Sequence, residues 1–289
     1  MLEKVNEKQF RAYGNHMPGP NPSTRLYGGQ MILQSYLAAK MVHSKRKIVS
    51  KLRVSFHSPG NLTDPLLIDV RIQNPTHLIL RQGKIISTAV AKCVSSSREL
   101  FRLALEHNNL SNFGSPTDYP PLEYYLSLSS GSSQYVQDSI HEYVERALFE
   151  TRPESISDFV YLNTKIGFKL RVWCRLHQRF RDNVFEDPLI VPILLSDYLV
   201  FNPVNIELYA LGFPDGVFAG ASMNHEIIVH KVDGFDPLGY FIYELECTVN
   251  SQNNVFMQGH IYDESRDCIL TFEQQGFVLS KDEALSSKM

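Results

Sequence analysis

Three polar side chains lie where the surrounding pattern calls for apolar ones, and their types are suited to acid–base chemistry. Asp197 falls within the apolar stretch 187–203, Gln274 shares the apolar face of a predicted strand at 267–279, and Ser222 follows a Gly-Ala pair. A buried carboxylate can act as a general base, while a hydroxyl and an amide can hydrogen-bond a reacting molecule. The alternatives are structural: an inward glutamine can bond a strand carbonyl, and such a serine can belong to a turn.

Asp197 is expected on a short buried helix. Pro192 suits a first helical turn and Pro203 cannot continue a helix, so the pattern predicts a helix from 191 to 201. Apolar residues lie on all sides of this helix, so its carboxylate projects among them. An ionised carboxylate in such surroundings costs several kcal/mol unless hydrogen bonds offset the loss of water. We therefore expect Asp197 to have partners from elsewhere in the chain, unless it lies at the exposed edge of a core helix.

A second apolar helix is predicted near residues 30–43, and Gly28 and Gly29 precede it. Two glycines let the backbone turn sharply and leave free N–H groups at a helix N-terminus. The helix dipole there favours an anion or a developing negative charge. The pair can equally be a plain turn.

Alternating hydrophobicity predicts the strands, and it does so in two similar sets. Each set surrounds one of the apolar helices, and short sequences recur in it: His57-Ser58-Pro59 followed by Asp64-Pro65-Leu66 is echoed by His230-Lys231-Val232 followed by Asp236-Pro237-Leu238. We interpret this as a duplicated unit in which an antiparallel sheet wraps one helix, which is an α+β fold. The predicted strands are 48–57, 65–73, 77–94 and 98–107 in the first set, and 166–179, 218–232, 238–250, 254–263 and 267–279 in the second.

The stretch between the two sets differs in composition. It contains Pro120-Pro121, a serine-rich tract at 127–133 and a predicted amphipathic helix at 134–149. We interpret it as a connector. The predicted organisation is a first unit at 1–110, a connector with one helix at 111–160, a second unit carrying the active site at 161–280, and a tail at 281–289.

Composition excludes several classes of protein. The chain has 289 residues, 43% of them hydrophobic, and a formal net charge of −3, so it is globular and not globally basic. We expect no nucleic-acid partner and no membrane span. Its four cysteines have no paired spacing, which suits a reducing compartment and predicts neither a zinc site nor a redox motif.

The two histidines that follow Ser222 are expected neither to activate its hydroxyl nor to bind a metal together. On a regular strand, His225 is three residues beyond Ser222 and should face the other side, so it is not expected to activate that hydroxyl as a nucleophile. His225 and His230 are also at odd spacing and should not share a metal. We expect no metal and no cofactor.

Three stretches of the sequence resemble the type II acyl-CoA thioesterases. The first two are the stretch 25–30, which ends in Gly-Gly-Gln, and the stretch 52–60, which ends in Pro-Gly. The third is the set Asp197 after Ser196, Ser222 before Asn224-His225, and Gln274 before Gln275-Gly276. The resemblance implies a double-hotdog fold, in which two central helices are each wrapped by an antiparallel sheet and the sheets join into one.

That resemblance also implies hydrolysis of fatty acyl-CoA to free fatty acid and coenzyme A, with coenzyme A as part of the substrate. Asp197, Ser222 and Gln274 would hold the hydrolytic water, and Gly28, Gly29 and Gln30 would bind the substrate. A thioester carbonyl is electrophilic enough for an oriented, partly deprotonated water to attack it directly.

The chain departs from the family pattern in two places near the third motif. Asn224 stands where the family usually has Asp, and 226–229 replaces an aromatic-containing run. Two rival functions follow: a catalytically weak acyl-CoA-binding protein, or a hotdog enoyl-CoA hydratase. Hotdog proteins usually associate, so a homo-oligomer is expected.

The last three residues, Ser287-Lys288-Met289, are similar to the Ser-Lys-Leu peroxisomal address. They predict a peroxisomal location and a peroxisomal import receptor as a partner. Coincidence is the alternative, since they can be ordinary polar residues of a tail.

Overall fold

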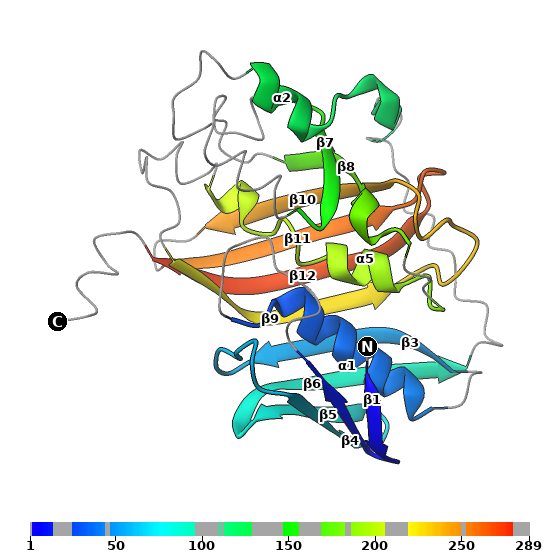
Figure 1. Ribbon diagram of the computed structural model, residues 1–289, viewed down its shortest axis with the longest axis vertical. Helices are drawn as coiled ribbons and strands as arrows, with labels where there is room; N and C mark the ends of the chain where they lie inside the picture. The colour runs from blue at the N-terminus through cyan, green and yellow to red at the C-terminus, as the bar shows by residue number, and fades with distance from the viewer. Residues whose placement is uncertain are drawn as a thin grey trace.

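A computed structural model describes residues 2–13, 25–43, 47–95, 110, 113–128, 147–155, 169–182, 186–205, 219–249 and 253–279. Within these residues the backbone forms a 12-stranded sheet, with two helices lying against one of its faces (Figure 1). The strands are β1 (Glu3–Asn6), β2 (Gln9–Ala12), β3 (Lys47–Phe56), β4 (Leu66–Arg71), β5 (Thr76–Gln82), β6 (Lys84–Ser95), β7 (Phe149–Pro153), β8 (Lys169–Leu176), β9 (Ala219–Val229), β10 (Phe241–Val249), β11 (Asn254–Tyr262) and β12 (Cys268–Leu279).

The order of the strands shows the predicted duplication. One half of the sheet runs β2-β4-β5-β6-β3 and the other runs β8-β10-β11-β12-β9, so the same connectivity occurs twice. The halves meet where β3 pairs with β9, and every pairing in the sheet is antiparallel. The predicted α+β double-hotdog architecture is therefore confirmed.

The helix of the first half is α1 (Gly28–Met41), which begins earlier than its apolar pattern indicated. Ten of its residues are buried, among them Ile32, Leu33 and Tyr36. Tyr27 is its N-cap and makes no side-chain capping bond. The first N–H groups of α1 therefore need acceptors from another part of the fold.

The helix of the second half is α5 (Ile190–Leu195), which is shorter than the predicted 191–201. The Ser196 hydroxyl donates to the carbonyl of Ile193 at 2.8 Å, and that carbonyl would otherwise accept the N–H of Asp197 in an α-helix. Beyond this point the backbone continues as tight turns, in which the N–H of Tyr198 bonds the carbonyl of Leu195 at 3.0 Å. Asp197 therefore lies in the turn that follows the helix.

A second buried carboxylate, Asp187, connects the C-terminal half of α1 to the residues just before α5. It accepts hydrogen bonds from the Tyr36 hydroxyl at 2.9 Å and from Lys40 Nζ at 2.6 Å, both on α1. Its Oδ1 also accepts the N–H of Leu189, the N-cap residue of α5, at 3.0 Å. Burial and the neighbouring Asp187 charge both raise the pKa of Tyr36, so the phenol stays a donor. This contact fixes α1 and α5 side by side (Figure 1).

Several strand predictions need correction. The predicted strand 77–94 is two strands, β5 and β6, which turn at Gly83 with a positive φ of 71° that glycine adopts readily. A single glycine between two polar residues gave too weak a turn signal. Residues 3–12, for which no strand was predicted, form β1 and β2, and β7 was not predicted either. The predicted strand 98–107 lies outside the described residues.

Part of the predicted connector belongs to the sheet of the second half. β7 pairs with β8, so Phe149 is in a strand and the predicted helix 134–149 does not extend that far. Residues 134–146 of that helix lie outside the described part of the chain. Short helices also occur at η2 (Pro116–Asp118), α2 (Leu122–Leu128) and η4 (Gln178–Phe180).

Connector residues cover the outer face of the second half, opposite α5. Phe113 stacks on Trp173 with ring centroids 5.4 Å apart, and Trp173 Nε1 donates to the carbonyl of Gly114 at 3.0 Å. Leu110, Ile242, Tyr262 and Cys268 complete this small core. The sheet of the second half is thus covered on both faces here.

The four cysteines, all within the described residues, form no disulfide bond, and Cys174 and Cys268 are buried. No helix in the described part of the chain is long and apolar enough to cross a membrane. Within those residues no three His, Cys, Asp or Glu side chains are grouped so as to bind a metal ion.

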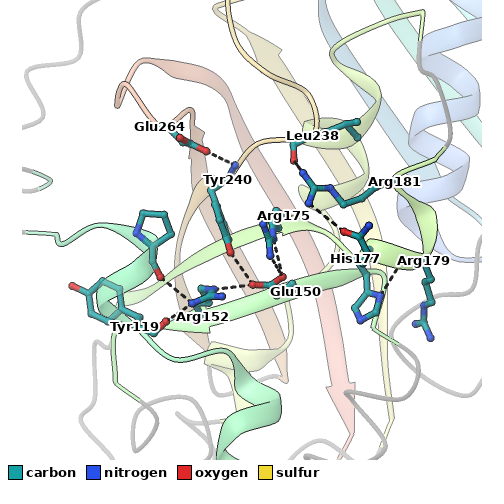
Figure 2. A network of polar contacts seen from close by, with 12 residues as sticks. Tyr119, Glu150, Arg152, Arg175, His177, Arg179, Arg181, Leu238, Tyr240 and Glu264 are labelled. Atoms are coloured by element: carbon teal, nitrogen blue, oxygen red, sulfur yellow. Dashed lines mark hydrogen bonds and ion pairs between the residues drawn. The ribbon is translucent and has the colours of Figure 1, made fainter.

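A network of charged side chains joins β7, β8 and the start of β10 around one carboxylate, Glu150 (Figure 2). Glu150 accepts hydrogen bonds from Arg152 Nε at 2.8 Å, from Arg175 Nε at 2.7 Å and from the Tyr240 hydroxyl at 2.8 Å. Arg152 also donates to the carbonyl of Tyr119 at 2.8 Å, which connects the network to the connector. Burial alone would raise the pKa of Glu150, but these three donors outweigh it and hold the pKa below the ordinary value of 4.5.

This lowered pKa predicts a pH-dependent stability. A carboxyl whose pKa is lower in the folded state stabilises the fold fully above its ordinary pKa, and the contribution is lost as pH falls through the folded value. We expect the free energy of unfolding to fall more steeply below about pH 4.5 in the wild type than in Glu150→Gln. Urea unfolding of the wild type and of Glu150→Gln, from about pH 7 to about pH 3, measures the two free energies. Parallel curves would contradict the assignment to Glu150, while Glu244, which has a lowered pKa from Arg171 and Lys169, contributes equally to both proteins.

Candidate active site

The predicted carboxylate lies at the N-terminus of α1. Asp197 is 7% exposed, and its Oδ2 accepts the N–H of Gly29 at 2.8 Å. The close approach depends on glycine, because a Cβ on Gly28 would lie 2.8 Å from the same oxygen. The positive end of the helix dipole stabilises the ionised carboxylate. The anion expected at the Gly-Gly turn is thus Asp197 itself, which takes the Gly29 N–H that we had assigned to the substrate.

Gln274 connects the carboxylate to Ser222. It lies on the inner face of β12 and is 1% exposed, as its alternation with apolar residues predicted. Its Nε2 donates to Asp197 Oδ1 at 2.9 Å and also to Ser222 Oγ. The three predicted residues therefore form one hydrogen-bonded line, Asp197–Gln274–Ser222, although they come from three different elements.

A β-bulge explains how β9 presents its side chains. Gln275 pairs with Asn224, yet the next residue Gly276 pairs with Ser222, so Met223 is an extra residue in β9. One extra residue reverses the alternation, and Ser222 and His225 consequently face the same side. The prediction that His225 faces away from Ser222 is therefore wrong. Its basis was regular alternation, which a bulge breaks.

His225 is the main site residue that the sequence did not indicate. It is fully buried, with Nδ1 3.5 Å from Asp197 Oδ1 and Nε2 3.2 Å from Ser196 Oγ. Aspartate, histidine and serine therefore lie in a row, as they do in serine hydrolases. Ser196 is fully buried and unable to meet a substrate. The Nε2 of His225 lies within hydrogen-bond distance of Ser196 Oγ, and its Nδ1 faces Asp197 without a hydrogen bond in the described residues. This arrangement does not activate Ser222 as a nucleophile.

Two tyrosines complete the surroundings of Asp197. Tyr27 lies before α1 and donates its hydroxyl hydrogen to the carbonyl of Leu194 at 3.0 Å, and Tyr243 lies on the inner side of β10. Both are buried, and burial together with the Asp197 charge raises the pKa of each well above its ordinary value. Both phenols therefore stay protonated and add no second charge beside Asp197.

The other predicted binding residue, Gln30, has a different role in the described residues. It is 1% exposed, and its Nε2 donates to the carbonyl of Tyr13 at 3.0 Å. That bond joins α1 to the backbone just after β2. Its role in substrate binding stays a prediction.

The two departures from the family pattern do not touch Asp197. Asn224 points to the outer face, where its Oδ1 accepts from Ser55 Oγ at 2.8 Å and its Nδ2 donates to Gln275 Oε1 at 3.2 Å. In the run 226–229, Glu226 forms an ion pair with Lys51 at 2.6 Å. Asn224 and Glu226 thus tie β9 to its neighbours, while Ile227 and Val229 are buried in the core beside His225.

Comparisons with known proteins give relatives that share nearly the whole chain. Acyl-CoA thioesterase 2 of Haemophilus influenzae is 24% identical over 292 residues, which cover 96% of this chain and 94% of that protein. Acyl-coenzyme A thioesterase 8 of Rattus norvegicus is 24% identical over 307 residues, which cover 100% of this chain and 90% of that protein. No protein-family model matches the chain.

Solved structures share the fold. The acyl-CoA thioesterase II TesB2 of Mycobacterium marinum superimposes with a TM-score of 0.68 at 16% identity, covering 97% of this chain and 96% of the other. The dehydratase domain of PpsC from Mycobacterium tuberculosis also superimposes, with a TM-score of 0.58 at 10% identity and coverage of 96% and 97%. The fold alone therefore does not distinguish the two kinds of protein.

Proposed function

We propose that this chain, which belongs to the type II acyl-CoA thioesterase family, hydrolyses acyl-CoA at the Asp197–Gln274–Ser222 line. The observation that carries the proposal is the double contact of the Gln274 amide, which holds a buried carboxylate and a hydroxyl together. A carboxylate held in this way can take a proton, and the neighbouring hydroxyl can donate a hydrogen bond.

The lone pairs of Asp197 define where water can bind. An ionised carboxylate accepts about four hydrogen bonds. Gln274 and His225 approach Oδ1, and Gly29 donates to Oδ2, which leaves acceptor capacity on Oδ2. A water that donates to this oxygen is oriented for attack, and its proton has an acceptor of fixed position.

The reaction then proceeds in two steps without a covalent enzyme intermediate. As the water oxygen bonds to the thioester carbonyl carbon, Asp197 takes one water proton and the carbonyl oxygen becomes an oxyanion. The Ser222 hydroxyl accepts from Gln274, so its own hydrogen is free to stabilise the developing charge. Collapse of the oxyanion breaks the carbon–sulfur bond, and the coenzyme A thiolate takes the proton from Asp197.

Release of free thiol from a panel of acyl-CoAs tests the proposal directly. We expect turnover with fatty acyl-CoA, and the chain length that gives the highest kcat/KM defines the substrate range. Binding without thiol release would instead identify an acyl-CoA-binding protein. Addition of water to an enoyl-CoA without thiol release would identify a hydratase, which shares the fold but leaves the thioester intact.

The peroxisomal location and the import receptor remain predictions from Ser287–Met289, which lie outside the described residues. Deleting these three residues should leave thioesterase activity intact and move the protein from peroxisomes to the cytosol. Imaging of full-length and truncated protein with an N-terminal tag measures the change. The same cytosolic distribution for both would mean that the tripeptide is coincidental. A homo-oligomer likewise remains a proposal, which the mass in solution tests.

A further inference from the structure

His225 has no part in the water mechanism described above, although it lies against the general base. It faces Gln274 directly across the β9–β12 pairing, and its ring stacks on Phe272 with centroids 6.0 Å apart. The side chain is fully buried. Its Nε2 lies within hydrogen-bond distance of Ser196 Oγ, whereas its Nδ1 faces Asp197 Oδ1 and has no hydrogen-bond partner within the described residues. A buried polar atom of this kind calls for an explanation.

The partner of each nitrogen determines where the ring carries its hydrogen. An ionised Asp197 is only an acceptor, so Nδ1 at 3.5 Å from Oδ1 is favourable when it carries hydrogen and repulsive when it presents a lone pair. Nε2 lies 3.2 Å from Ser196 Oγ, a group that can donate or accept. The neutral ring therefore has hydrogen on Nδ1 and accepts the Ser196 hydroxyl hydrogen at Nε2.

Ser196 is compatible with this tautomer because its hydroxyl can change acceptor. Its Oγ donates to the carbonyl of Ile193 at 2.8 Å. When His225 carries hydrogen on Nδ1, the Ser196 hydroxyl hydrogen must turn to Nε2, which otherwise has no donor. Ser196 therefore permits this tautomer, and the Asp197 charge favours it.

Resting on the proposed function, we propose that His225 is a positioning residue, whose Nδ1–H, favoured by the Asp197 charge, orients the Asp197 carboxylate for the hydrolytic water. Gln274 alone holds Oδ1 by one hydrogen bond, which permits the carboxylate to rotate about it. The Gly29 N–H on Oδ2 and the attraction of an Nδ1–H that lies 3.5 Å from Oδ1 together limit that rotation. Groups that orient a reactive side chain in this way commonly change rates by about 10- to 100-fold when removed.

Two substitutions separate the nitrogens. The amide nitrogen of Asn occupies the place of Nδ1, and that of Gln occupies the place of Nε2. We expect His225→Gln to lower kcat about 10- to 100-fold with KM changed about twofold or less, and His225→Asn to retain activity within about threefold of the wild type. Equal losses in both variants, or a loss confined to KM, would overturn the proposal.

His230 offers a matched control, since it follows β9 and its Nε2 lies 3.2 Å from Thr271 Oγ1, away from Asp197. His230→Gln and His230→Asn should be equal in kcat. A difference between them as large as that at His225 would show that the Asn–Gln contrast is not specific to the site, and would overturn the assignment.

A direct measurement keeps the proposal testable if a variant does not fold. The side-chain ¹⁵N shifts of the wild-type chain report which ring nitrogen carries hydrogen, and we expect Nδ1–H for His225. Hydrogen on Nε2 alone would overturn the proposal. Because this measurement needs no turnover, it is independent of the thioesterase assay: absent thiol release rejects the function, whereas the wrong tautomer rejects only the role of His225.

Discussion

Replacing Asp197 with Asn is expected to lower kcat on the order of a hundredfold or more, with the melting temperature unchanged or raised. The amide has no basic oxygen to take a proton from water. Its shape still suits the site, because its oxygen can accept the Gly29 N–H and its nitrogen can donate to Gln274. Gln274 Oε1 has no hydrogen-bond partner in the described residues and can turn to receive that nitrogen.

Asp187→Asn is the matched control for this variant. Asp187 is as buried as Asp197, at 6% against 7% exposed, and flanks the same short helix. It bonds Tyr36 and Lys40 and lies at the opposite end of α5 from Asp197. We expect Asp187→Asn to lower the melting temperature and to leave kcat near the wild-type value. Thermal unfolding and thiol release measured on both proteins give the comparison, and a wild-type rate from Asp197→Asn would reject the mechanism.

Gly28→Ala is expected to lower kcat about 10- to 100-fold without touching any reacting group. The new Cβ would lie 2.8 Å from Asp197 Oδ2 and 3.4 Å from its Cγ, so the carboxylate must move away from the Gly29 N–H. Alanine is favoured over glycine in a helix by about 1 kcal/mol, which offsets part of the strain. The fold should therefore persist while the general base is displaced.

A double-mutant cycle tests whether the loss acts through Asp197. In the Asp197→Asn background, Gly28→Ala should cost little further activity, because the group it displaces no longer reacts. Losses that multiply independently would show that Gly28 acts on the substrate instead. The kcat values of the four proteins supply the result.

Much of the fold was predictable because the pattern of apolar residues is strong. Alternation located β3, β4 and β8 to β12, and the recurring helix with its strands indicated the duplication. The N-terminal strands were missed because β1 is exposed along its whole length and carries no buried face. The end of α5 could not be read from propensity, since the Ser196 side chain takes over a backbone acceptor there.

The sequence indicated several residues of the site but not how they contact one another. Asp197 and Gln274 were recognisable because each is a polar residue among apolar ones, and the structure brings both to Ser222. His225 was excluded because strands were assumed to be regular. The Gly-Ala pair before Ser222 was the available signal for an irregular β9.

The two halves of the chain, which meet where β3 pairs with β9, contribute different groups to the site. Asp197, Ser222 and Gln274 all belong to the second half, yet the N–H on Asp197 Oδ2 comes from Gly29 in the first. A change in the second half can alter the chemistry itself. A change in the core of the first half can alter the rate without touching a reacting group, by moving the backbone at Gly28 and Gly29 relative to Asp197.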